Sequence, residues 1–405
     1  MTVLTAPLDG FDLRTLSDAF YADPYPIYAA LRRSEPVKCM PDGSYFLTRH
    51  GDVEAVYKDG ARFSSDKRVE FRPKYGETPL YEHHTTSLVF NDAPLHSRVR
   101  RLIAGALTPP AIGLLEPSLV ALVDGLLDAI AAKGKFDVIA DFAAAIPVEV
   151  IGNLLGVPRD ERGELRGWSL AILGALEPAP SVEQLASGNR AVEEFIAYLK
   201  RLVAERRRHP GNEETDVLTR LIGTEEAGER LSEAELLHNC IFILNAGHET
   251  TTNLIGNGLH LLASWPEERA RLLAEPALIA TAVEEFLRFE SSNQLGNRIT
   301  TADVVIGGVA LPPGTPVTLC IGAANRDPAL FADPDRLDIA RTPNRHLAFG
   351  FGVHHCTGAV LARLEGRIAI ARFLRRFPEF RLDGAAIRGR RARFRGFVAL
   401  PAAIS

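Results

Sequence analysis

The sequence predicts a mainly α-helical protein with a minor β component. Apolar residues recur with a period near 3.6 over long stretches, which is typical of amphipathic helices. The clearest helical segments are 117–133, 141–155, 181–208, 232–263, 265–274 and 277–289. Strand-like patterns are confined to residues near 37–50, 298–320 and 394–402, so the sheet component is expected near the N-terminus and in the last third of the chain.

The first of these regions predicts a strand over Ser44–Thr48 and a helix over residues 51–58. In the second, residues 303–309 and 317–320 predict two strands joined by the Leu-Pro-Pro-Gly turn at 311–314. The chain shows no low-complexity linker and no internal repeat, so we expect one domain over residues 1–405.

Composition excludes several classes of protein. The 405 residues include 46 basic and 51 acidic side chains, for a net charge of −5, which implies no general attraction to nucleic acid. The four cysteines are scattered without a C-x-x-C pair, which favours a reducing, cytoplasmic setting. Neither a signal peptide nor an apolar run long enough for a membrane span is expected.

The most informative run extends from Phe349 to Gly358 and reads F-G-F-G-V-H-H-C-T-G. It places Cys356 on a glycine-rich loop before an apolar-periodic segment that predicts a helix. The apolar positions of that segment are Val360, Leu361, Leu364 and Ile368. A thiol just before a helix N-terminus is stabilised as thiolate, the form that serves as a metal ligand.

A second chemical pattern lies in the long apolar run 236–260 of the predicted helix 232–263. One face carries an aromatic ring, an amide, a small residue and a carboxylate at i, i+3, i+4 and i+7: Phe242, Asn245, Ala246 and Glu249. Thr250 lies beside them, and its hydroxyl is expected to bond back to the carbonyl of Ala246 and bend the helix. Gly247 weakens the same turn, so we expect a groove here.

These two runs resemble the cytochrome P450 family. Cys356 and its neighbours match F-x-x-G-x-H-x-C-x-G, and Ala246 to Thr250 match A-G-x-[DE]-T without a departure. The resemblance extends over the whole chain and implies a helical prism enclosing haem b, with Cys356 as the axial thiolate ligand of the iron. It also implies a monooxygenase that activates O2, in which Glu249 and Thr250 relay protons.

The resemblance implies further roles for single residues. The expected haem contacts are His96, Arg100, Arg298 and His354 at the propionates, with Phe349 and Gly358 in the cysteine loop. The expected structural triad is Glu285, Arg288 and Arg336. Leu337 and Thr357 depart from the family pattern, which usually has an aromatic and an aliphatic residue there.

The chain contains neither a dinucleotide-binding G-x-G-x-x-G nor a cysteine set for an iron–sulfur cluster, so a separate electron donor is expected. The resemblance implies a ferredoxin of [2Fe–2S] type with an NAD(P)H-dependent reductase. Its expected docking residues are Arg98, Arg101, Arg363, Arg367 and His355. We expect a monomer.

The substrate is expected to be a small hydrophobic molecule with one polar group. The expected pocket residues are Phe242, Asn245, Gln294, Leu295, Phe397 and Val398. Three other interpretations stay open from the sequence: a peroxide-driven haem-thiolate enzyme, a haem-based gas sensor or carrier, and a helical binding protein without haem. The Glu249–Thr250 pair argues against the first, because peroxide already brings the protons.

Overall fold

The computed structural model describes residues 10–212, 216–223 and 230–404. The chain forms two compact units. Unit 1 comprises Met1–Ser65, Asn257–Cys356 and Ala386–Val398, and unit 2 comprises Asp66–Gly256, Thr357–Ala385 and Ala399–Ser405. The long helix α13 (Glu233–Ser264) begins in unit 2 and ends in unit 1.

Unit 1 holds most of the strands. Its helices are α1 (Asp18–Ala22), α2 (Tyr25–Ser34), α3 (His50–Lys58), α14 (Pro266–Ala274), α15 (Ile279–Phe289) and α16 (Ile321–Ala324). Its strands are β1 (Val37–Cys39), β2 (Tyr45–Leu47), β3 (Phe63–Ser64), β5 (Leu295–Thr300), β6 (Val304–Ile306), β7 (Val309–Leu311), β8 (Pro316–Cys320), β10 (Ile387–Arg388) and β11 (Phe397–Ala399), whose last residue belongs to unit 2.

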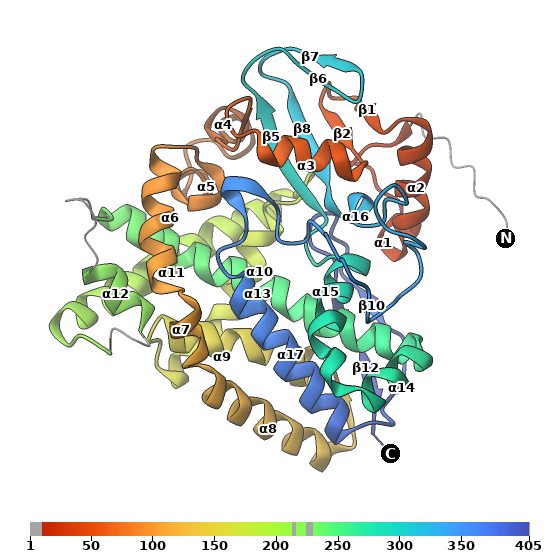
Figure 1. Cartoon of the computed structure of the whole chain (residues 1–405). Coiled ribbons are helices and arrows are strands. Elements are labelled where there is room, and N and C mark those ends of the chain that lie inside the picture. The colour runs from red at the N-terminus through yellow and green to blue at the C-terminus, as the bar shows by residue number, and fades with distance from the viewer. Residues whose placement is uncertain (1–9, 213–215, 224–229, 405) are drawn as a thin grey trace. The chain divides into compact units, whose positions relative to one another are not determined.

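The main sheet of unit 1 has the order β1-β2-β8-β5-β3, with β2 and β8 parallel and the other pairs antiparallel. Helix α3 crosses this sheet (Figure 1), and its Val53 and Val56 share one core cluster with Leu47 of β2. The neighbouring Phe46 packs instead with Tyr28 of α2. Successive side chains of a strand point to opposite faces, so the two clusters cover the two sides of the sheet.

One strand expectation is wrong. The segment 303–309 is not a single strand: β6 and β7 form a hairpin around Gly307 and Gly308, whose φ angles are +54° and +85°. Two glycines with positive φ form the tight turn of a two-residue hairpin. The predicted strand 317–320 belongs to β8, which pairs instead with β5, and Arg298 lies within β5.

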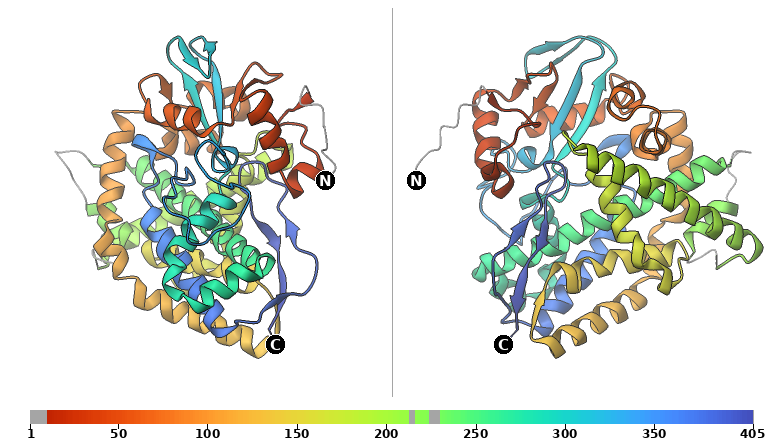
Figure 2. Two further views of the ribbon diagram at one scale, coloured as in Figure 1. Left: turned by 45° about the vertical axis from the view of Figure 1, so that its right-hand side comes forward. Right: turned by 180° about the vertical axis from the view of Figure 1, so that it is seen from behind.

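Unit 2 is mainly helical. Its helices are α4 (Arg68–Tyr75), α5 (Pro79–Thr86), α6 (Leu95–Ala106), α7 (Pro109–Gly113), α8 (Glu116–Lys133), α9 (Ala145–Leu154), α10 (Leu165–Gly174), α11 (Val182–Arg208), α12 (Val217–Gly223), the first part of α13, and α17 (Ala359–Arg376). Helix α17 packs along α8 (Figure 1), and the small sheet β4 (Lys135–Asp137), β12 (Pro401–Ala403), β9 (Arg381–Leu382) has the C-terminal strand β12 in its middle (Figure 2).

The mainly helical prediction is confirmed, and the predicted helices agree with α8, α9, α11, α13, α14 and α15 within a few residues. The start of α11 has a local cause: Ser181 and Gln184 form a capping box, with the Gln184 amide donating to the Ser181 hydroxyl at 3.2 Å. In the described part of the chain, none of the helices combines the length and the apolar character needed to cross a bilayer.

Candidate active site

The cysteine loop lies in unit 1 from Phe349 to Cys356 and has a defined backbone. The amide of Cys356 donates to the Phe349 carbonyl at 2.9 Å, and the amide of His355 donates to the Gly352 carbonyl at 3.0 Å. Gly352 has a φ of +69°, and a Cβ there would lie 2.3 Å from the Tyr57 carbonyl oxygen of α3. Only glycine fits this position. The loop therefore holds Cys356 in a fixed place with its side chain exposed.

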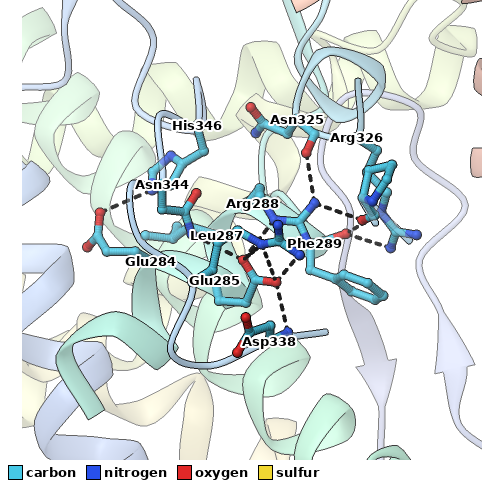
Figure 3. A network of polar contacts seen from close by, with 12 residues as sticks. Glu284, Glu285, Leu287, Arg288, Phe289, Asn325, Arg326, Asp338, Asn344 and His346 are labelled. Carbon is cyan, nitrogen blue, oxygen red and sulfur yellow. Dashed lines mark hydrogen bonds and ion pairs between the residues drawn. The ribbon is translucent and has the colours of Figure 1, made fainter. Parts of the chain in front are cut away.

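Residues that the sequence analysis missed support this loop. His346 Nδ1 accepts from the Ala348 amide at 3.2 Å, while its Nε2 lies 3.1 Å from the Glu284 carboxylate of α15. Asn325 Oδ1 accepts from the Leu347 amide at 2.7 Å. These contacts tie the start of the loop to α15 and to the end of α16 (Figure 3). No short motif distinguishes such a His or Asn before folding.

Glu285 and Arg288 form the expected ion pair on α15, with both side chains 0% exposed and nitrogen–oxygen distances of 2.7 Å (Figure 3). The expected third member, Arg336, is wrong: only its backbone carbonyl takes part, accepting from Arg288 at 3.3 Å. Arg341 is the second cation, with its Nε 3.2 Å from both Glu285 oxygens. Asn344 adds a donor at 3.1 Å, so the carboxylate is fully coordinated.

The oxygen-side helix α13 runs without a break through the A-G-x-E-T turn. The expected bond is present: the Thr250 hydroxyl donates to the Ala246 carbonyl at 2.6 Å. Packing explains the glycine at position 247. A Cβ there would lie 2.4 Å from Ile151 of α9, so the absence of a side chain allows α13 and α9 to lie close together. The predicted weakening of this turn is not seen in the helical hydrogen bonding.

One face of α13 is nevertheless open. From Leu236 to Leu259 every residue is buried except Phe242, Ala246, Gly247 and Thr250, and Ala246 is exposed. Phe242, Ala246 and Thr250 follow one another at four-residue spacing, so they share one face. A core helix with a bare stripe of this kind fits a flat ligand.

Behind this face, unit 2 contains a buried acid that the sequence analysis passed over. Glu365 of α17 is 1% exposed and hydrogen-bonds to the Thr251 hydroxyl of α13. Burial raises the pKa of Glu365 to about 8. The interaction with Thr251 lowers that pKa and offsets only part of the effect of burial. The signal was present in the sequence, because Leu361, Leu364 and Ile368 place Glu365 on the apolar face of its helix.

The raised pKa predicts a pH-dependent stability. Between its ordinary 4.5 and about 8, folded Glu365 holds a proton that the unfolded chain has lost, so the free energy of unfolding falls as pH rises. The slope reaches up to about 1.4 kcal/mol per pH unit. Glu365→Gln keeps an acceptor for Thr251 without a charge, and urea unfolding should show that this variant loses the slope.

The control for that measurement is Glu379→Gln, which changes an exposed carboxyl in the loop after α17. It should retain the wild-type dependence on pH. Equal slopes for wild type and Glu365→Gln would show that Glu365 is ionised in the folded protein throughout this range.

The residues expected at the haem propionates fall in both units. His96 is buried and Arg100 is half-buried, one turn apart on α6 of unit 2. Arg298 of β5 is buried, with its guanidinium carbon 5.1 Å from the Tyr57 ring centroid, and His354 is half-buried in the cysteine loop of unit 1. Gly358 is the N-cap of α17 in unit 2.

Two of the expected pocket residues have other roles within unit 1. Leu295 belongs to the core cluster that contains Phe20, Phe46 and Cys320. The Gln294 amide nitrogen donates to the Ser291 carbonyl at 2.7 Å and to the Tyr25 hydroxyl at 3.4 Å. Their packing assigns both side chains to the interior of unit 1 rather than to a pocket wall.

The C-terminal hairpin of unit 1 carries Phe397 and Val398. Phe397 is sandwiched between the His260 ring, with centroids 4.6 Å apart, and the Arg388 guanidinium at 3.8 Å, whereas Val398 is 59% exposed. Glu290 anchors this hairpin through Arg388 and Arg395. Burial alone would raise the pKa of Glu290, but the charges of Arg395, Arg388 and Arg326 outweigh it and lower that pKa to about 2.

Arg98, expected to dock a ferredoxin, is instead engaged inside unit 2. Its guanidinium pairs with the Glu235 carboxylate of α13 and donates to the Arg230 carbonyl at 3.1 Å. This bidentate pair ties α6 to α13, which leaves Arg98 a structural role.

Each unit by itself presents residues of the kinds that suit an iron porphyrin. Unit 1 presents one exposed thiol on a rigid glycine loop, and a thiolate is a strong single ligand for haem iron. Unit 2 presents a helix with a bare, largely apolar stripe next to a hydroxyl and a carboxylate. Cationic side chains suited to two propionates occur in both units.

Comparison with known proteins gives a consistent result. The sequence profile of the family "Cytochrome P450" matches residues 180–388. The "Biotin biosynthesis cytochrome P450" of Bacillus subtilis (strain 168) is 38% identical over 372 residues, covering 91% of this chain and 92% of the relative. The "Vitamin D(3) 25-hydroxylase" of Pseudonocardia autotrophica is 38% identical over 387 residues, covering 94% and 93%.

A solved structure described as P450BioI in complex with hexadec-9Z-enoic acid ligated acyl carrier protein superimposes with a TM-score of 0.91 at 36% identity, covering 96% of this chain and 100% of that one. The predicted P450 fold is thereby confirmed. This chain belongs to the cytochrome P450 family and is a monooxygenase of small organic substrates that carries haem b on an axial cysteine thiolate.

Proposed function

We propose that Cys356 is the axial thiolate ligand of the haem and that Glu249 and Thr250 of α13 would deliver the protons that the reduction of O2 consumes. The observation that carries this proposal is the exposed Cys356 side chain on a loop whose backbone only glycine can form. When bound, the haem supplies the reduction of O2 and the insertion of one oxygen atom into the substrate. His96, Arg100, Arg298 and His354 would hold its propionates.

The protein's own contribution is to place a proton donor and keep bulk water out. The Thr250 hydroxyl donates a hydrogen bond to the Ala246 carbonyl at 2.6 Å, so its oxygen lone pairs are left to accept a hydrogen bond from another group. Glu249 is buried beside it. An acid next to an oriented hydroxyl can pass protons one at a time without a column of water.

Replacing Thr250 by alanine tests this role. Without the hydroxyl, we expect electrons to be consumed while product per electron pair falls by at least roughly tenfold, with hydrogen peroxide released instead. The measurement compares NAD(P)H consumed, peroxide formed and substrate oxidised.

The matched control is Thr252→Ala, which removes a similar back-bonded hydroxyl (to the His248 carbonyl at 2.9 Å) from a buried position of the same helix. It should keep the wild-type yield. A Thr250→Ala enzyme that converts NAD(P)H into product as efficiently as wild type would exclude the proton role.

We propose a substrate that is mainly apolar with one polar group. The half-buried Phe242 supplies apolar surface on the open face, and Asn245, at the edge of that face, is 4% exposed. Its Oδ1 has no hydrogen-bond partner among the described residues. A buried amide of this kind gains from a polar group on a ligand. The relatives named after vitamin D3 and complexed with a hexadecenoic acyl chain handle molecules of this general type.

We propose a ferredoxin with an NAD(P)H-dependent reductase as the electron donor. Arg101, Arg363, Arg367 and His355 are its candidate docking residues; Arg98 is excluded because Glu235 neutralises it. The single domain over residues 1–405 and the monomeric state stay predictions.

One spectroscopic series tests the proposal. The purified protein is reduced and exposed to carbon monoxide, and a strongly red-shifted Soret band is expected for a thiolate-ligated haem. Titration with hexadec-9Z-enoic acid and vitamin D3 should shift the Soret band. Turnover with ferredoxin, reductase and NAD(P)H, but not with peroxide alone, would support the monooxygenase route proposed here.

A further inference from the structure

The segment 83–91 is hydrogen-bonded to α13 through the buried side chain of Asn239. Asn239 of α13 is 0% exposed, and its Oδ1 accepts a hydrogen bond from the Leu88 amide at 3.0 Å. Its Nδ2 donates to the Glu235 carbonyl one turn earlier at 2.8 Å, which fixes the amide plane. Asn239 thus accepts from the Leu88 amide, a buried backbone donor that would otherwise lack a partner.

Segment 83–91 is also held by hydrogen bonds within itself, so the bond between Asn239 and the Leu88 amide positions the whole segment. Asn91 Nδ2 donates to the Thr85 carbonyl at 3.0 Å and to the Ser87 carbonyl at 2.7 Å. The Ser87 hydroxyl donates to the His83 carbonyl at 2.5 Å. A segment with this many hydrogen bonds from its side chains to its own backbone has little freedom to rearrange.

A ring contact reinforces the same junction. His238, the residue before Asn239, lies with its ring centroid 5.7 Å from that of His83. Burial, followed by the neighbouring His84 and His238, lowers the pKa of His83 well below its usual value, so the His83 ring itself is neutral at neutral pH. This ring contact adds buried area, and His238 Nε2 also lies 3.5 Å from the Glu82 carboxylate, whereas the Asn239 bond is the one that fixes a backbone amide of the segment.

Asn239 lies on the same side of α13 as the open stripe. It precedes Phe242 by three residues and Ala246 by seven, the spacing of a single helix face. Asn239, which holds segment 83–91, therefore shares its helix face with the residues proposed above to contact the substrate and to deliver protons.

We propose that Asn239 is a specificity-determining positioning residue, which fixes segment 83–91 against α13 and so pre-forms one wall of the substrate pocket. The inference rests on the proposed function, in which this face of α13 meets the substrate. A wall fixed before binding needs no ordering when the substrate enters, and this preorganisation increases affinity.

Two sets of variants of the full-length, haem-loaded protein test the proposal. Asn239→Leu removes the acceptor; its control, Asn189→Leu, removes an equivalent acceptor for the Leu80 amide at the start of α5. Leu88→Pro removes the donor, and the extended backbone of Ser87 (φ −69°, ψ 146°) is compatible with a following proline. Leu88→Ala, its control, loses the side chain but keeps the amide.

We expect Asn239→Leu and Leu88→Pro to weaken binding of hexadec-9Z-enoic acid by roughly tenfold, read from the Soret shift, with little change for the two controls. Amide hydrogen exchange in segment 83–91 should accelerate in Asn239→Leu but not in Asn189→Leu. Thermal unfolding should shift similarly in these two, which separates positioning from general stability.

Equal affinities for Asn239→Leu and Asn189→Leu, or for Leu88→Pro and Leu88→Ala, would overturn the proposal. If Asn239→Leu fails to fold, the Leu88 pair decides alone. Failure of the proposed function has a different signature: the wild type would then lack the thiolate-type carbon monoxide spectrum, while the exchange result in segment 83–91 would be unaffected.

Discussion

Cys356→Ser should abolish the thiolate spectrum and reduce oxygenation to background. A serine hydroxyl is neutral at physiological pH and is a hard, weak donor, so it does not supply the electron density that a thiolate gives to haem iron. The variant keeps the size of the side chain, and the loop backbone is held by Gly352 and by the Cys356 amide bond to Phe349, so the fold should survive. Haem content, the reduced carbon monoxide spectrum and turnover are the measurements.

Cys39→Ser is the matched control, because Cys39 is, like Cys356, an exposed cysteine of unit 1. It lies on β1, outside the loop that carries Cys356, and its loss should leave all three measurements unchanged. A Cys356→Ser protein with the wild-type carbon monoxide spectrum and turnover would disprove the ligand assignment.

Interactions local in sequence could be predicted, because their geometry is set by the helix. The bond from Thr250 to Ala246 follows from four-residue spacing, and the Glu285–Arg288 pair follows from three-residue spacing. Both depend only on the chain being helical there, which the apolar period already indicated. The exposed cysteine loop was likewise readable from its glycines.

Interactions between distant segments could not be predicted in the same way. Arg336 and Arg341 are five residues apart in an irregular loop, and only the folded path decides which side chain reaches Glu285. Leu295 was assigned to the wrong environment because a strand alternates its two faces, so the side on which a residue lies depends on where pairing begins. The β5–β8 pairing that sets this register depends on the β6–β7 hairpin between them.

The loss of Glu285 should be among the most destabilising single changes in unit 1. Arg288 is 0% exposed and has Glu285 as its ionic partner, so Glu285→Ala leaves an uncompensated buried charge. Breaking a buried pair in this way typically costs about 3–5 kcal/mol. We expect a loss of that size in the free energy of unfolding in urea, and reduced haem retention because α15 also holds the cysteine loop through Glu284 and His346.

Two arginine variants separate the observed cluster from the one that the family pattern suggested. Arg341→Ala removes a half-buried guanidinium from Glu285 and should cost an intermediate amount, about 1–3 kcal/mol. Arg336→Ala keeps the backbone carbonyl that Arg288 uses, so its cost should stay within about 0.5 kcal/mol, as for an ordinary surface change. If Arg336→Ala were the more harmful of the two, the ion-pair cluster would be the one that the sequence pattern suggested, and the path of residues 336–344 around Glu285 would differ from that described above.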